Sequence, residues 1–161
     1  MGAFDGWGSA ALGGGIGGTA TGIALFFTIR HDRRARGEDR LHASADRALL
    51  GAANLLATLL TNQARPKVLS DVVLFSNASI TFLARMAKND PAETFVSDIH
   101  NELNNRALEF RRTPNATAAK LGAAARAYLD AVGIWLLTPG TYKPEQDVAA
   151  FVAGYDENPT V

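Results

Sequence analysis

The sequence predicts an all-α protein, in which one N-terminal transmembrane helix is followed by an antiparallel helical bundle of about four helices plus a short C-terminal helix. Three observations lead to this prediction. The stretch from Gly8 to Ile29 carries no charged residue, and later segments repeat apolar residues at helical spacing between prolines. No segment shows a convincing alternation of apolar and polar residues. The chain is therefore expected to hold one membrane span and one folded domain.

The predicted span is the uncharged segment of 22 residues from Gly8 to Ile29. About 20 apolar residues, each rising 1.5 Å, are needed to cross a hydrocarbon layer of about 30 Å. All 16 Lys and Arg residues lie at or after Arg30, and only Asp5 is charged before the span. Because cytoplasmic flanks collect Lys and Arg, we expect a single-pass protein of the cell membrane with its N-terminus outside and its C-terminal domain in the cytoplasm.

Small residues in the span are spaced for close helix packing. Glycines four apart let two helix backbones approach in lipid, where dispersion drives association. We expect the span to pair with itself or with the span of another membrane protein. The same spacings also arise in any glycine-rich segment, so a span without packing and a soluble loop remain alternatives. The expected span-packing residues are Gly13, Gly14, Gly17, Gly18 and Gly22.

A basic juxtamembrane flank follows the span. Its five arginines are opposed by Asp32, Glu38 and Asp39, so the flank is only modestly positive. Near anionic lipid, each cation contributes about 1 kcal/mol, which makes membrane lipid an expected but unselective partner. The expected flank residues are Arg30, Arg33, Arg34, Arg36 and Arg40.

The first helix of the bundle is predicted at about 38–64. Pro66 is expected to start the second helix as its first residue, and the stretch 68–88 carries the apolar side of that helix. The uncharged stretch 48–61 has the length of a buried helix rather than of a span. The expected core positions are Leu41, Ala45, Ala48, Leu49, Ala52, Leu55, Leu56, Leu59 and Leu60 in the first helix, and Val72, Phe75, Ser79, Phe82 and Met86 in the second.

Two more long helices are predicted at 91–112 and 116–137, followed by a short helix at 144–154. Asp90 is expected to cap the third helix. The inward stripe of that helix is predicted to be Phe95, Ile99, Leu103, Ala107 and Phe110, with Asp98, Asn101, Asn105 and Glu109 facing water. The predicted organisation is 1–7 extracytoplasmic N-terminus, 8–29 transmembrane helix, 30–40 basic flank, 41–154 cytosolic bundle and 155–161 polar tail.

Composition excludes several classes of function. With 16 basic and 16 acidic residues, the chain has no net charge and no electrostatic reason to bind nucleic acid. The sequence contains no cysteine, which excludes disulfides, cysteine-ligated zinc and thiol catalysis. No phosphate-binding loop, dinucleotide fingerprint or Ser-His-Asp grouping is present, so no cofactor is expected.

The densest group of metal-capable side chains is Asp98, His100 and Glu102. Successive members are two residues apart on a helix, so they point about 200° from one another and cannot form one site. We expect this group to lie on a solvated helix face, and His31 and His42 to lie at the surface. The sequence thus predicts neither catalytic nor metal-binding residues.

The segment Arg36-Gly37-Glu38-Asp39-Arg40-Leu41-His42 resembles the Arg-x4-6-His motif of HEPN ribonucleases. Those enzymes are all-helical bundles in which Arg and His from paired protomers attack RNA, and the resemblance would give these roles to Arg36 and His42. It covers seven residues, and Gly37 stands where a polar residue is usual in the family.

The favoured functional interpretation is a membrane-anchored protein-interaction or scaffold module that is not an enzyme. Its bundle would bind an unidentified protein, and its span would self-associate. One alternative is a small oligomeric pore-forming or lysis-type protein built from the glycine-rich spans. The other is a membrane-tethered ribonuclease of the HEPN type.

Overall fold

The computed structural model describes residues 39–86, 90–138, 141–142, 144 and 147–156. This part of the chain is all-α. Its helices are α3 (Asp39–Leu60), α4 (Arg65–Leu83), α5 (Glu93–Arg112), α6 (Pro114–Leu137) and α7 (Val148–Asp156). The predicted segments 1–7 and 8–29, and most of the flank 30–40, lie outside the described residues.

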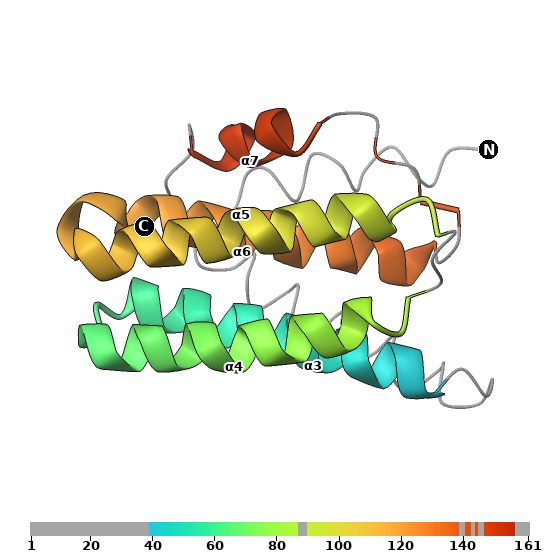
Figure 1. Ribbon diagram of the computed structural model, residues 1–161, viewed down its shortest axis with the longest axis horizontal. Coiled ribbons are helices and arrows are strands. Elements are labelled where there is room, and N and C mark those ends of the chain that lie inside the picture. The colour runs from blue at the N-terminus through green and yellow to red at the C-terminus, as the bar shows by residue number, and fades with distance from the viewer. Residues whose placement is uncertain (1–38, 87–89, 139–140, 143, 145–146, 157–161) are drawn as a thin grey trace, which may run out of the picture. The chain divides into compact units, whose positions relative to one another are not determined.

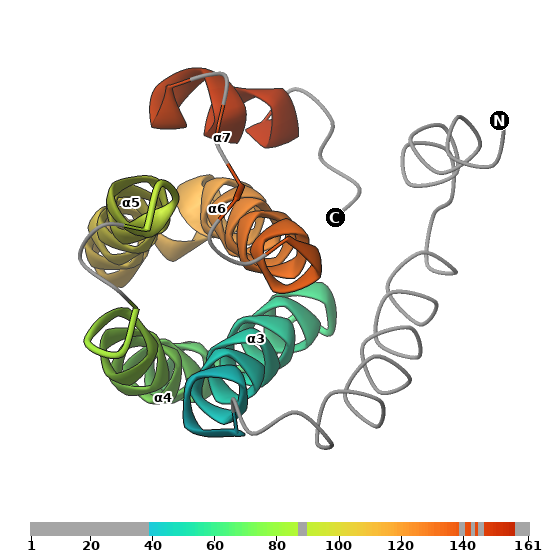
Figure 2. The same ribbon diagram turned by 90° about the vertical axis from the view of Figure 1, so that its right-hand side faces the viewer.

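Helices α3 to α6 form an up-and-down bundle. Viewed along the bundle, each occupies one corner of a square, and α7 lies across α5 and α6 (Figure 2). The turns between α3 and α4 and between α5 and α6 lie at the same end, at the left of Figure 1. This arrangement follows from long helices joined by short connections, which place consecutive helices antiparallel.

Local sequence signals explain where the helices begin and end. Asn62 has a positive φ of 48°, and Gln63 N–H donates to Thr58 O at 3.1 Å, which closes α3 with a Schellman-type turn. Prolines stand in the first turns of α4 and α6, where a missing N–H costs no helical hydrogen bond. Asp90 was predicted to cap the third helix, but the N-cap of α5 is Ala92, which has no side-chain cap; the Asp90 Oδ1 instead accepts the Ala92 N–H at 2.9 Å in the turn before the helix.

The predicted core is confirmed with two exceptions. All five inward positions predicted in the second helix and all five in the third are buried. The predicted end of the second helix at residue 88 was too late, because α4 ends at Leu83 and Met86 lies in the turn after it. Leu60 is 41% exposed, contrary to the prediction, and is the last residue of α3. Leu41 is only half-buried, since it lies in the first turn of the same helix.

Aromatic rings fill the centre of the bundle. Tyr128 meets Phe75 edge-on with ring centroids 4.7 Å apart, and its hydroxyl forms a 2.7 Å hydrogen bond with Ser79. Trp135 packs against Phe82 at 5.2 Å and donates from Nε1 to Asp90 Oδ2 at 2.9 Å. These contacts join α6 to α4 and to the turn before α5.

The apolar stretches of α3, α4 and α6 supply buried core residues, among them Leu55, Phe75 and Trp135. None of the helices in the described ranges is long and apolar enough to cross a membrane. The predicted boundary between bundle and tail at residues 154 and 155 is two residues too early, because α7 continues to Asp156 and its last two residues bind the bundle.

Candidate functional site

A shallow groove of about 530 Å³ runs between α4 and α5. Its lining is mostly apolar and contains no acidic residue. Helix α7 covers the side of α5 that lies away from α4 (Figure 2). The lining residues are Leu69, Val72, Val73, Ser76 and Asn77 from α4, and Asn104, Ala107, Leu108 and Arg111 from α5.

Two large apolar side chains of the groove face solvent. Val73 is 58% exposed and Leu108 is 57% exposed, one on each helix. Leu69, also in the lining, is half-buried beside them. Single exposed apolar residues are common, but a group of them that lines a concave surface is typical of a binding site.

Two polar side chains of the groove, Ser76 and Asn104, are hydrogen-bonded to each other. Ser76 Oγ donates to Asn104 Oδ1 at 2.7 Å, and Asn104 Nδ2 donates to His100 Nε2 at 2.9 Å. Because an amide nitrogen only donates, Nε2 accepts and the proton of neutral His100 stands on Nδ1. These hydrogen bonds hold Ser76 and Asn104 in one arrangement beside the apolar side chains of the groove.

His100 is buried, contrary to the expectation of a solvated face. Its exposed fraction is 5%, and its ring lies 5.8 Å from that of Phe75, whereas Asp98 is exposed and Glu102 half-buried. Burial lowers the pKa of His100 from its usual 6.5 because the charged imidazolium loses its hydration. The prediction was wrong here because His100 follows Ile99 on the margin of the inward stripe, and its Nε2 finds a partner one turn later.

The groove ends at Arg111, which is exposed. No carboxylate of the described residues forms an ion pair with its guanidinium. The Arg65 side chain donates to the backbone oxygen of Arg111 and so joins the start of α4 to the end of α5. Exposed Arg65 and Arg112 lie in the same two terminal turns and make this end of the bundle basic, whereas Lys67 is paired with Asp71.

One carboxylate near this end, that of Asp71, is buried and hydrogen-bonded within the bundle. Asp71 is 3% exposed, accepts from Thr58 Oγ1 at 2.6 Å and pairs with Lys67 Nζ at 2.5 Å. Burial acts to raise the pKa of Asp71, but the hydrogen bonds from Lys67 and Thr58 and the Lys67 charge outweigh it and lower the pKa below 3.8. Asp71 therefore joins α3 to α4 and is not available to a ligand.

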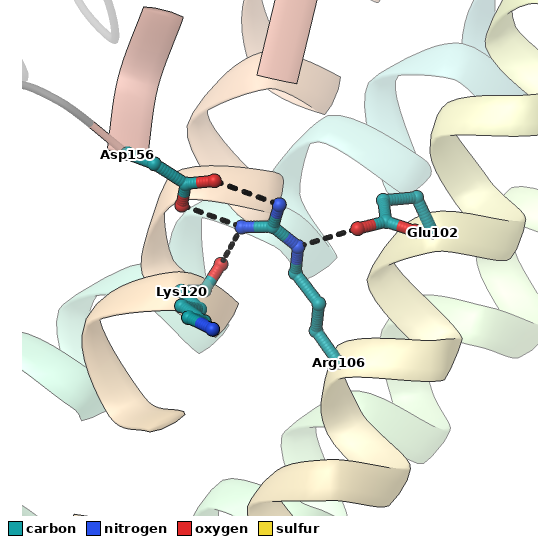
Figure 3. Close-up of polar contacts among 4 residues, drawn as sticks. All are labelled: Glu102, Arg106, Lys120 and Asp156. Atoms are coloured by element: carbon teal, nitrogen blue, oxygen red, sulfur yellow. Dashed lines mark hydrogen bonds and ion pairs between the residues drawn. The ribbon is translucent and has the colours of Figure 1, made fainter. Parts of the chain in front are cut away.

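On the other side of α5, an arginine holds the C-terminal helix (Figure 3). The Arg106 guanidinium donates to both carboxylate oxygens of Asp156, at 2.6 and 2.9 Å, and to Glu102 Oε1 at 2.7 Å. It also donates to the backbone oxygen of Lys120 at 2.8 Å. This bidentate ion pair fixes both the distance and the orientation of the Asp156 carboxylate relative to the Arg106 guanidinium. Sequence reasoning missed it because the partners lie 50 residues apart.

The remaining residues predicted for function fall mostly outside the described part. The span-packing glycines and the flank residues Arg30, Arg33, Arg34 and Arg36 lie outside it, whereas Arg40 is exposed in the first turn of α3. The prediction that His42 is a surface residue was wrong, because its ring is half-buried and lies 5.9 Å from that of Trp135. Arg36, its partner in the ribonuclease-like motif, is not described.

The geometry of the groove supports binding by shape and apolar contact. Among the residues that the structure describes, no three His, Cys, Asp or Glu side chains are grouped to hold a metal ion.

No family model matches the chain, and comparisons with curated proteins and with solved structures find no match either.

Proposed function

We propose that this chain is a single-pass membrane protein whose helical bundle is a protein-interaction module. In this proposal the segment 8–29 anchors the chain and self-associates through its glycines, and the bundle holds a partner protein at the cytoplasmic face. The observation that carries the proposal is the apolar groove between α4 and α5, with Val73 and Leu108 more than half exposed in it.

The free energy gained by burying apolar surface supports a binding role for these side chains. Fully burying a valine or leucine side chain is worth about 1.5–3 kcal/mol, so a partner that covers both gains appreciable affinity. A partner also meets a preorganised surface, because the groove lies between two helices of a closed bundle and its Ser76 and Asn104 side chains are already hydrogen-bonded.

The anchoring part is tested by alkaline carbonate extraction of membranes from cells that express the full-length chain with a C-terminal tag. We expect the protein in the pellet and the tag protected from protease in intact cells. Release into the supernatant would mean that residues 8–29 are not a span, and digestion of the tag would reverse the proposed topology.

The interaction part is tested by placing a photo-crosslinking residue at single positions of the full-length chain in cells. We expect crosslinked adducts from Val73 and Leu108 and none from Leu74, which is 63% exposed on the same helix but does not line the groove. Equal labelling from Val73 and Leu74, or labelling from neither groove position, would contradict binding in the groove.

The glycine rows favour a second candidate, an oligomeric pore-forming or lysis-type protein. Its distinguishing property is ion leakage from loaded vesicles after addition of the full-length chain. Leakage that the substitutions Gly17→Leu and Gly18→Leu abolish would favour the pore, whereas intact vesicles and adducts from Val73 would favour the interaction module.

A further inference from the structure

The molecule itself shows how this bundle binds an apolar helix. Helix α7 covers α5 and α6, with Val152 buried and the ring of Phe151 lying 5.2 Å from that of Phe95. The last residue of the helix, Asp156, places its carboxylate on Arg106 of α5. An apolar face supplies the contact area, and one carboxylate at the helix end sets the position along the bundle.

The groove on the other side of α5 offers the same two features. Its lining is apolar along most of its length, and Arg111 stands at its end with an exposed guanidinium. Arg111 is five residues after Arg106, so both cations belong to the last two turns of α5. The difference is that α7 supplies a carboxylate to Arg106, whereas no described residue supplies one to Arg111.

The charge around Arg111 is one-sided. Arg65 and Arg112 are exposed beside it, the charge of Lys67 is balanced by Asp71, and the sequence from 57 to 70 contains no acidic residue. Glu109 is the one acidic residue in the last turn and a half of α5, and Asp71 is buried against Thr58. A ligand that places negative charge at this end is therefore attracted, while a basic ligand is repelled.

We propose that the groove binds an amphipathic helix of another protein. The apolar side chains of that helix pack against Val73 and Leu108, and a carboxylate in one of its terminal turns pairs with Arg111. This inference rests on the proposed interaction function and names the chemistry of its partner. A second copy of the chain complements the groove less well, because its own groove would bring no acidic side chain to Arg111. A flat lipid surface does not fill a concave apolar site.

The test uses the full-length chain in mild detergent and four labelled helical peptides of about five turns, with leucines at i, i+4, i+7 and i+11. Two of the peptides carry a pair of glutamates, one in the first turn and the other in the last turn. The third carries two glutamines in the last turn, and the fourth carries two lysines there. Fluorescence anisotropy measures their affinities. We expect one glutamate peptide to bind at least about tenfold more tightly than the lysine peptide, with the glutamine peptide between them.

Matched variants locate the binding. Arg111→Glu is expected to reverse the order of the glutamate and lysine peptides, whereas Arg112→Glu, the same charge change one residue further, leaves the order unchanged. Val73→Asp and Leu108→Asp are expected to abolish binding, and Leu74→Asp to preserve it. Asp156→Asn is expected to leave affinity unchanged, which shows that the peptide has not taken the place of α7.

The outcomes separate this inference from the proposed function. One outcome is that the glutamate and lysine peptides bind with the same affinity as the glutamine peptide, and that Val73→Asp weakens this binding. The carboxylate preference is then wrong, while the groove remains an interaction site. If no peptide binds, both are wrong. A dimer in light scattering that Val73→Asp dissolves, or anionic vesicles that displace the glutamate peptide, would also overturn the inference in favour of a second copy or a lipid surface.

Discussion

Gly51 of α3 packs directly against the backbone of Phe75 in α4. A Cβ placed on Gly51 would lie 3.0 Å from the Phe75 Cα and 3.4 Å from its Cβ. Since the nearest atom belongs to the backbone, no side-chain rotation relieves the contact. The absence of a side chain at Gly51 thus allows α4 to pack closely enough for Phe75 to be fully buried.

We therefore expect Gly51→Ala to destabilise the bundle. The gain in helix propensity is about 1 kcal/mol, but overpacking a tight contact costs about 1–3 kcal/mol. Gly133 of α6 is the matched control, because nothing lies within 4 Å of a Cβ built there, so Gly133→Ala should gain up to about 1 kcal/mol. Urea unfolding of the full-length chain, followed by circular dichroism, measures both. A Gly51→Ala variant as stable as wild type would show that the helices separate without cost.

The buried carboxylate of Asp71 should make stability fall in acid. Its pKa in the folded chain lies below 3.8, so its contribution is present above that pH and is lost as the pH falls through the lower, folded-state value. Asp71→Asn should remove this part of the pH dependence. At neutral pH, Asp71→Ala should cost about 1–3 kcal/mol, because Thr58 Oγ1 is left buried without its acceptor. Equal acid sensitivity in wild type and Asp71→Asn would refute the assignment.

His100 should add a second acid-sensitive step at higher pH. Burial lowers its pKa below 6.5 in the folded chain, so the unfolded chain takes up the proton first as the pH falls. The contribution of His100 is therefore complete above pH 6.5 and is lost as the pH falls through the folded-state pKa. His100→Gln should flatten the stability profile just below pH 6.5, whereas His42→Gln should leave this step in place. A profile unchanged by His100→Gln would contradict the prediction.

The ion pair between Arg106 and Asp156 should hold α7 on the bundle. Hydrogen bonds to charged groups contribute about 1.5–3 kcal/mol, with the lower end expected here because Asp156 is 32% exposed. Asp156→Asn and Arg106→Met should each speed hydrogen exchange of the α7 amides, and the double variant should add little to either. Glu109→Gln, which removes an exposed carboxylate from the same helix, is the control. Unchanged exchange in α7 would mean that its apolar contacts suffice.

Periodicity explains why the helices were predictable. The apolar positions of α4 and α5 recur every three or four residues, and the turns between helices carry Pro or Asn, so local sequence alone indicates the elements and their inward faces. Prediction failed at the ends: Leu60 is exposed, and α7 continues past the predicted boundary at residues 154 and 155. It also failed at His100, because a histidine on the margin of a stripe is buried or exposed according to its neighbours.

The groove could not be predicted for a related reason. Val73 and Leu108 look like ordinary apolar residues on two different helices, 35 positions apart in the sequence. They line one surface only because α4 and α5 pack side by side. Likewise, the sequence does not distinguish Arg111 from any other cation in the last turn of a helix, because the apolar lining beside it is formed partly by another helix.

The sequence by itself determined that the described chain is helical and which face of most helices is buried, because both depend on spacing along the chain. Only the tertiary structure decided the partners of the polar side chains: Asp71 with Thr58 across 13 residues, Ser79 with Tyr128 across 49, and Arg106 with Asp156 across 50. The physical reason is that hydrogen bonds and ion pairs act over about 3 Å. Which groups come that close is set by the packing of whole helices, and no local pattern in the sequence records it.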